Sequence, residues 1–222
     1  SPIFELEPYS IAIDSVLTFA AQFRSDGLEL REFSPGGGFG IGYLHHQLPP
    51  PIASYAEVIT TSVKDRCADL DLGEPKLTIE PGRAIVGRAG VALYTVGFIK
   101  HVPGVRTYVA VDGGMGDNIR PALYGAKYEA IVANRIMQKA EQRVTIVGKY
   151  CESGDILVQD ATLPSVQEGD IIAIPASGAY APSMASTYNL NGRPAIVLVD
   201  GGRSRLLRRR ETYKDLMLAD QD

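Results

Sequence analysis

The chain has 222 residues, enough for one large domain or two small ones, and its 45% hydrophobic content is ample for packed cores. A net charge of −4 argues against a general nucleic-acid binder, and no apolar run is long enough to span a membrane. Two cysteines, Cys67 and Cys151, cannot form a disulfide framework, so we expect a reduced, cytoplasmic protein. No targeting segment is visible, and we expect no metal site.

The first part of the chain alternates between helix and strand patterns. Apolar residues at close to helical spacing predict helices over residues 8–23 and 52–70. Short β-prone runs predict strands over residues 28–33 and 77–79, and residues 43–51 form a Pro-rich loop. Strand, loop, helix and strand of these lengths predict part of a parallel β/α barrel or a doubly wound sheet.

Two short strings follow the predicted strands, at the strand ends where ligands bind in α/β folds. Residues 36–38 are three successive glycines, whose backbone can approach an anion closely; a plain flexible loop is the alternative. Glu80-Pro81-Gly82-Arg83 places a carboxylate and a guanidinium on either side of a Pro-Gly pair. Because proline fixes φ and glycine permits an unusual φ, the backbone can hold the two charged side chains in set directions. Alone, a four-residue string of this kind is more typical of a surface turn with a local ion pair.

From residue 87 onward the pattern changes to short β-rich runs separated by Gly, Pro and Asp turns. The predicted strands cover residues 91–99, 107–111, 144–147, 156–159, 171–174 and 195–199. Such runs predict a β-sandwich or barrel, so we divide the chain into residues 1–88 and 89–222. The arginine-rich stretch at residues 203–210 is interpreted as a solvated strand edge, since acidic residues follow it.

Three strings of unusual composition lie between these strands. Arg120 and Tyr124 follow a Gly-rich turn; on one helical turn they would share a face suited to gripping a carboxylate. Cys151-Glu152-Ser153-Gly154-Asp155 holds a thiol beside two acids, and Gly178-Ala179-Tyr180 opens a polar loop over residues 181–191. Taken singly, each string could be only a turn or a cap, and the cysteine a small buried residue.

Taken together, the order and spacing of six strings resemble those of the diaminopimelate decarboxylases across nearly the whole chain. The strings are Gly36-Gly37-Gly38-Phe39-Gly40, Glu80-Pro81-Gly82-Arg83, Asp112-Gly113-Gly114-Met115, Arg120-Pro121-Ala122-Leu123-Tyr124-Gly125, Cys151-Glu152-Ser153-Gly154-Asp155 and Gly178-Ala179-Tyr180. That family belongs to the alanine-racemase-like decarboxylases, which depend on pyridoxal phosphate. The resemblance implies the C-terminal part of a β/α barrel followed by a β-sandwich or Greek-key barrel. It also implies decarboxylation of meso-diaminopimelate to L-lysine, the last step of lysine biosynthesis.

The resemblance also implies residue roles. Those for the cofactor are Gly36, Gly37, Gly38, Glu80, Gly82, Arg83 and Tyr180. Those for the substrate are Arg83, Arg120, Tyr124, Glu152 and Tyr180. Glu80 would keep the ring nitrogen protonated so that the ring can accept an electron pair, and Cys151 could return a proton to the substrate. In this family a homodimer shares its active sites, so Cys151 and Glu152 would reach into the neighbouring subunit.

One departure from the family concerns the lysine that binds the cofactor covalently, because no lysine of this chain has a matching context. The chain starts at Ser1-Pro2-Ile3-Phe4, and we expect a C-terminal portion that is inactive alone and binds the cofactor weakly. Its β-domain should be ordered, and its barrel part incomplete or dependent on a partner. The alternatives are a decarboxylase of the same fold for ornithine, arginine or carboxynorspermidine, or a non-catalytic homologue. Arg120, Tyr124 and Glu152 favour a substrate with a zwitterionic far end.

Overall fold

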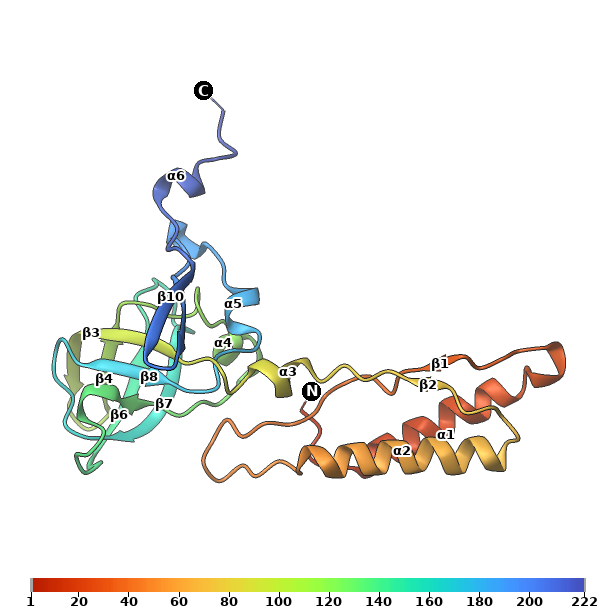
Figure 1. Ribbon diagram of the computed structural model, residues 1–222. Helices are drawn as coiled ribbons and strands as arrows, with labels where there is room; N and C mark the ends of the chain where they lie inside the picture. Colours follow the sequence, from red (N-terminus) through yellow and green to blue (C-terminus); the bar gives the residue numbers. More distant parts are fainter. Residues whose placement is uncertain (1, 222) are drawn as a thin grey trace. The chain divides into compact units, whose positions relative to one another are not determined.

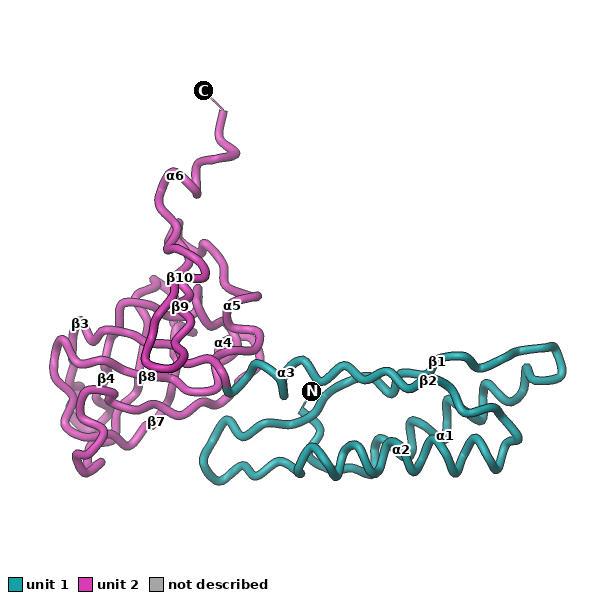
Figure 2. The backbone as a smooth tube through the Cα atoms, viewed as in Figure 1, with its two compact units in different colours: residues 1–88 teal, residues 89–222 magenta. Residues whose placement is uncertain are grey.

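The computed structural model of the chain describes residues 2–221 and forms two compact units, residues 1–88 (unit 1) and 89–222 (unit 2), drawn in Figure 1 and coloured separately in Figure 2. Each unit has its own secondary structure and is described by itself. No helix within residues 2–221 combines the length and apolar character needed to cross a membrane.

Unit 1 consists of two long helices and a two-stranded parallel sheet. Its elements are α1 (Glu7–Ala21), η1 (Arg24–Asp26), β1 (Glu32–Phe33), α2 (Ile52–Asp69), β2 (Lys76–Leu77) and α3 (Gly82–Val86). The two predicted helices are confirmed within a few residues at their ends. The predicted strands are shorter than expected, because only Glu32 and Phe33 pair with Lys76 and Leu77. Two adjacent parallel strands with their helices are consistent with part of a β/α barrel.

The core of unit 1 is formed by one face of each long helix. Residues four apart on α2 point inward, and α1 contributes a matching row, as expected for amphipathic helices. The fully or nearly buried core side chains are Tyr9, Ile13, Leu17, Phe33, Phe39, Tyr55, Ile59, Val63 and Cys67. Phe39 stacks on Tyr55 with ring centroids 4.5 Å apart, and Tyr9 contacts both rings edge-on. This aromatic cluster lies directly beside the glycine run.

Unit 2 is built on a mixed six-stranded sheet with strand order β5-β8-β3-β4-β6-β7. Its strands are β3 (Ala92–Val102), β4 (Arg106–Val111), β5 (Ile131–Val132), β6 (Gln142–Val147), β7 (Ile156–Leu163) and β8 (Ile171–Ile174). The long strand β3 pairs with β8 through its first half and with β4 through its second half. The register shifts between Val96 and Phe98, and such a bulge bends a strand.

Strand direction places three loops at one end of this sheet. β4 and β6 pair in parallel, and β3 runs antiparallel to both β4 and β8. β4, β6 and β8 therefore run in the same direction, and their C-terminal ends lie at the same end of the sheet. The segments that follow them contain Arg120, Cys151, Glu152 and Tyr180.

Short elements and a separate hairpin complete unit 2. They are α4 (Arg120–Tyr124), η2 (Ala133–Arg135), α5 (Ala181–Met184), η3 (Tyr188–Leu190), β9 (Ile196–Asp200), β10 (Arg203–Arg208) and α6 (Tyr213–Leu216). β9 and β10 form their own antiparallel sheet, almost entirely exposed, as expected for a solvated strand edge. The stretch 181–191, interpreted as a polar loop, instead contains two single helical turns, too short to show a helical period.

Asp170 fixes η2 to the start of β8. Its side chain is 3% exposed and accepts hydrogen bonds from Asn134 Nδ2 at 2.9 Å, Arg135 Nε at 2.9 Å and the Gln167 amide at 2.7 Å. Burial alone would raise the pKa of this carboxyl, but these donors together hold it below its ordinary value. The charged form is therefore the one that stabilises unit 2.

We expect Asp170→Asn to lower the free energy of unfolding by about 1–3 kcal/mol near neutral pH, because Arg135 loses its buried partner. Since the native pKa is depressed, this contribution is complete above the unfolded pKa near 3.8 and is lost as pH falls through the native value. Urea unfolding followed by circular dichroism at pH 7 and pH 3 measures it. Asp200→Asn, an exposed carboxylate in β9, is the control; equal effects of the two substitutions would contradict the assignment.

Candidate functional site

The glycine run and Glu80 meet at the C-terminal ends of β1 and β2. Gly37 and Glu80 form a parallel bridge, and the Glu80 amide donates a 3.0 Å hydrogen bond to the Gly36 carbonyl oxygen. A Cβ at Gly37 would lie 2.0 Å from the Glu80 carbonyl oxygen, so only glycine permits this approach. Gly36 and Gly38 have φ of 82° and 90°, which glycine adopts without strain. The structure thus brings these residues together as a glycine cradle (residues 36–38).

The cradle is held from both sides by hydroxyl groups. Tyr9 Oη donates to the Gly37 carbonyl oxygen at 2.7 Å, and burial, followed by the neighbouring Tyr55, raises the pKa of Tyr9 to about 12, which keeps that proton in place. Ser34 Oγ donates to Glu80 Oε1 at 2.9 Å and accepts from the Gly36 amide at 3.1 Å. Ser34 therefore ties the Glu80 carboxylate to the cradle, a role that the sequence interpretation missed.

Arg83 occupies a different setting from the exposed turn that its string suggests. Residues 82–86 form helix α3, which the sequence interpretation missed because one turn shows no period. The Arg83 side chain is buried, its Nη1 donates to Tyr43 Oη at 2.6 Å, and its guanidinium carbon lies 5.7 Å from the Tyr43 ring centroid. Tyr43, in the Pro-rich loop, thus fixes the direction of this cation.

In unit 2 the structure brings Arg120 and Tyr180 together. Arg120 begins α4 and is buried; its guanidinium carbon lies 5.6 Å from the ring centroids of both Tyr128 and Tyr180. Its Nη1 also donates a hydrogen bond to Tyr128 Oη. Two rings and a hydroxyl therefore hold the cation in one orientation. Tyr124 is confirmed on the same helical turn, but it is 64% exposed and has different surroundings from Arg120.

Cys151 and Glu152 lie in the loop that follows β6, and both side chains are exposed. The Glu152 carboxylate accepts hydrogen bonds from the Gly154 amide at 3.2 Å and from Ser153 Oγ at 3.3 Å. The loop lies against α4, since a Cβ at Gly154 would be 4.0 Å from Ala122 Cβ. Cys151 and Glu152 are therefore presented at the same end of the sheet as Arg120.

Acidic and phenolic groups that are buried or partly buried lie within and next to these loops. Burial raises the pKa of the Asp117 and Asp155 carboxyls, although backbone N–H groups that donate to each oppose the effect. Burial, with the Asp117 and Asp155 charges, raises the pKa of Tyr150 to about 12, and the same causes raise that of Tyr94. The sequence interpretation assigned none of these groups a role.

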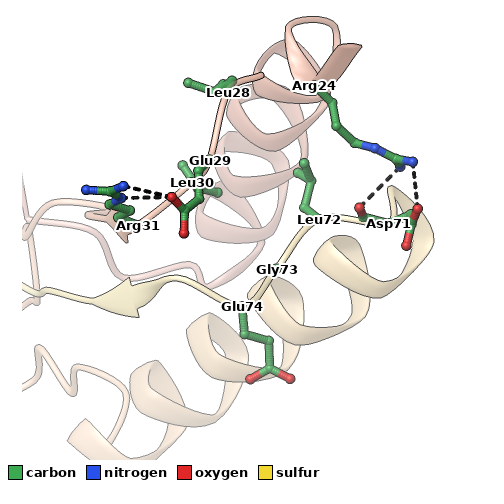
Figure 3. Close-up of a pocket in the computed structure, with 9 residues that line it drawn as sticks. All are labelled: Arg24, Leu28, Glu29, Leu30, Arg31, Asp71, Leu72, Gly73 and Glu74. Carbon is green, nitrogen blue, oxygen red and sulfur yellow. Dashed lines mark hydrogen bonds and ion pairs between the residues drawn. The ribbon is translucent and has the colours of Figure 1, made fainter. Parts of the chain in front are cut away.

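Two hollows on the surface of residues 2–221 contain none of the predicted site residues. One, of about 490 Å³, lies at the N-terminal ends of β1 and β2, where Arg24 pairs with Asp71 at 2.7 Å (Figure 3). The other, of about 580 Å³, surrounds the turn between β3 and β4 at residues 101–107. Both hollows are at the opposite strand ends from the glycine cradle and the loops of unit 2.

Comparison with known families identifies this arrangement. Residues 12–178 match the family described as pyridoxal-dependent decarboxylase, C-terminal sheet domain. The chain belongs to this decarboxylase family. The match spans both units and includes the glycine cradle, Glu80, Arg120 and the loop after β6.

Relatives of this decarboxylase family extend the likeness to almost every residue of the chain. The diaminopimelate decarboxylase of Bacillus subtilis (strain 168) is 47% identical over 99% of this chain and 50% of its own length. That of Staphylococcus aureus (strain COL) is 42% identical over 97% of this chain and 51% of its own length. The chain thus spans about half the length of the curated relatives it matches.

Solved structures of decarboxylases share the fold. A diaminopimelate decarboxylase from M. jannaschii in complex with L-lysine has a TM-score of 0.91 at 35% identity, covering all of this chain and 50% of that one. A lysine/ornithine decarboxylase from Vibrio vulnificus has a TM-score of 0.74 at 22% identity over 87% of this chain and 50% of that one, which shows the fold alone. The expected fold class, part of a β/α barrel followed by a β-domain, is confirmed.

The close approach at Gly37 predicts a strong effect of one methyl group. Gly37→Ala should lower the free energy of unfolding of unit 1 by roughly 1–3 kcal/mol, because the Glu80 backbone must move away. Hydrogen exchange of the Glu80 amide should also accelerate, since its bond to Gly36 is lost. Gly73→Ala, where a Cβ meets nothing within 4 Å, is the matched control. An unchanged hydrogen-exchange rate of the Glu80 amide in Gly37→Ala would show that the close approach of Gly37 to Glu80 does not require glycine.

Proposed function

We propose that this chain is part of a pyridoxal-phosphate-dependent enzyme that decarboxylates meso-2,6-diaminopimelate to L-lysine. The relatives from Bacillus subtilis and Staphylococcus aureus, matched over 99% and 97% of this chain, carry that name, and one solved relative is a complex with L-lysine. The observation that carries the proposal is the buried Arg120 guanidinium held between Tyr128 and Tyr180. Such a fixed cation suits a substrate whose far end bears a carboxylate.

The charge pattern distinguishes this substrate from diamine precursors. The far end of diaminopimelate carries a carboxylate and an ammonium, for which Arg120 and Glu152 would be the opposite charges. The far end of ornithine carries only an ammonium, which Glu152 would attract but Arg120 would repel. The preference for diaminopimelate over ornithine would therefore come both from the attraction of Arg120 for the far carboxylate and from its repulsion of a lone ammonium.

The cofactor fits the residues of unit 1. The glycine cradle has no side chains to obstruct an approaching phosphate, and Ser34 holds the Glu80 carboxylate beside the cradle. Residues 36–38 would hold the phosphate through backbone amides, Glu80 would face the pyridine nitrogen, and Gly82 and Arg83 would complete the contacts from unit 1. Tyr180 is the contact proposed from unit 2. Bound pyridoxal phosphate supplies the electron sink for loss of carbon dioxide.

Two side chains would handle protons in the reaction. The Glu80 carboxylate would keep a proton on the pyridine nitrogen, because a negative charge there stabilises the protonated form. Cys151 Sγ would deliver a proton to the substrate carbon that loses carbon dioxide. The exposure of Cys151 and Glu152 supports a role in the pocket of a second copy, and so a homodimer with shared sites. The free thiols support a cytoplasmic location.

The full-length protein should release carbon dioxide from meso-diaminopimelate with a kcat/KM about two orders of magnitude or more above that for ornithine or arginine. The reason is that a substrate without the far carboxylate leaves the buried Arg120 unmatched. Carbon dioxide release from each compound, with equal enzyme and cofactor, measures the preference. A preference for ornithine would refute the proposed substrate.

Glu80→Gln should reduce kcat roughly 10²–10³-fold while cofactor absorbance is retained, because a neutral amide no longer favours a proton on the ring nitrogen. The matched control is Glu74→Gln, an exposed carboxylate at the opposite strand end of unit 1, which should leave kcat unchanged. Near-normal turnover in Glu80→Gln would remove Glu80 from the mechanism.

A further inference from the structure

The carboxylate of Asp155 lies buried between the loop that follows β4 and the loop that follows β6. Asp155 is 3% exposed; its Oδ1 accepts a 2.6 Å hydrogen bond from the Met115 amide and its Oδ2 a 2.9 Å bond from the Tyr150 amide. Each carboxylate oxygen therefore accepts a hydrogen bond from a different loop. One side chain joins two segments that are 35 residues or more apart in sequence.

Both loops lack a side chain at the point where they approach this carboxylate. A Cβ at Gly114 would lie 2.5 Å from Asp155 Oδ1, and a Cβ at Gly148 would lie 2.1 Å from Oδ2. Gly114 also has a φ of +155°, which disfavours other residues. Glycine at these two positions therefore lets the backbone of each loop come close to the carboxylate, and a larger residue at either position would collide with it.

Asp155 also closes the turn that contains Cys151 and Glu152. The Asp155 amide donates to the Glu152 carbonyl oxygen at 3.1 Å, and the Asp155 carbonyl oxygen accepts from the Gly148 amide at 2.9 Å. The side chain and the backbone of one residue therefore fix both ends of this turn.

The other loop leads directly to Arg120. The amides of Asp117 and Asn118 both donate to the Gly114 carbonyl oxygen, at 2.9 and 3.1 Å, and Asn118 Oδ1 accepts from the Arg120 amide at 3.4 Å. A shift of Met115 would therefore be transmitted through this turn to the start of α4.

We propose that Asp155 is a positioning residue that fixes both the turn holding Cys151 and Glu152 and the segment that leads to Arg120, so that each is presented to its active site in one arrangement. This inference rests on the proposed function: Arg120 would bind the carboxylate in its own pocket, while Cys151 and Glu152 of the same chain would serve the pocket of the second copy, so one Asp155 would support both sites of the homodimer. Asp155 reaches the substrate only through the two loops and has no contact of its own with it.

The tie can be measured without any turnover. Asp155→Asn keeps the size of the side chain but offers one acceptor oxygen to two N–H donors, so at least one loop is released. In the full-length protein we expect hydrogen exchange of the Met115 or Tyr150 amide to accelerate at least tenfold. The matched control is Asp160→Asn in β7, whose side chain pairs only with Arg106 and Arg143 among the ion pairs of the described residues. Unchanged exchange at both amides would overturn the proposal.

The kinetic consequence is a lower kcat/KM for diaminopimelate with the cofactor retained. Asp155→Asn should lower kcat/KM for diaminopimelate by about ten- to a hundredfold, as expected for a misplacement of the order of 1 Å. Cofactor absorbance should be unchanged, because the proposed phosphate and ring contacts lie mainly in unit 1. Full kcat/KM for diaminopimelate in Asp155→Asn would refute the positioning role while leaving the proposed function intact. If ornithine is preferred but the amides still exchange faster, the proposed function fails and the tie between the loops survives.

A second variant tests the same carboxylate from the other side. Gly148→Ala retains Asp155 but places a methyl group where its carboxylate lies, so it should reproduce the faster exchange and the lower kcat/KM. The double variant should be no worse than the more impaired single variant, because both changes remove one interaction. Multiplicative effects would contradict the proposal. If Asp155→Asn does not fold, Gly148→Ala decides alone: normal kcat/KM would overturn the proposal and a reduced value would support it.

Discussion

The common direction of β4, β6 and β8 is the constraint on which the candidate site of unit 2 depends. Strands that run the same way end at the same end of a sheet, so the segments that follow them converge. Arg120, Cys151, Glu152 and Tyr180 all lie in such segments, although they come from stretches of the chain up to 60 residues apart. Asp155 then fixes the relative position of two of these segments, because its one carboxylate accepts a hydrogen bond from each of them.

Unit 1 uses the same principle with fewer strands. β1 and β2 are parallel, so the glycine cradle after one strand meets Glu80 after the other. The aromatic cluster holds the glycine cradle in place, because Tyr9 donates a hydrogen bond to the Gly37 carbonyl oxygen and Tyr55 accepts one from the Gly40 amide. The hydrophobic core and the candidate cofactor site therefore share residues, and a change in either affects both.

Much of this arrangement could be predicted from the sequence, since its signals are local. Short β-rich runs located six strands of unit 2 but missed the two-residue β5, helical spacing located α1 and α2, and the glycine strings marked the loops. Short elements such as α3 were missed because a single turn contains no period. Most of the predicted site residues have distinctive neighbours in sequence, such as the Pro-Gly pair between Glu80 and Arg83, and these neighbours were the signal.

The supporting residues could not be predicted for a physical reason. Ser34 meets Glu80, Tyr43 meets Arg83 and Asp155 meets Met115 across 40 or more residues of sequence, so nothing local identifies the partner. The parallel pairing of β4 with β6 is equally non-local, because period-two patterns do not state strand direction. Asp155 stands within the Cys-Glu-Ser-Gly-Asp string, but the sequence does not show which groups its carboxylate contacts. One of them, the Met115 amide, is 40 residues away, so its role in binding backbone amides could not be predicted.

The most direct test of the account is a crystal structure of the full-length protein with pyridoxal phosphate and L-lysine. The α-carboxylate and α-ammonium of lysine are the end of diaminopimelate that does not react, so they report where the far end of the substrate binds. The account predicts the carboxylate within about 3 Å of the Arg120 guanidinium and the ammonium at a Glu152 carboxylate. Lysine bound with its carboxylate elsewhere, and Arg120 in contact only with protein groups, would contradict it.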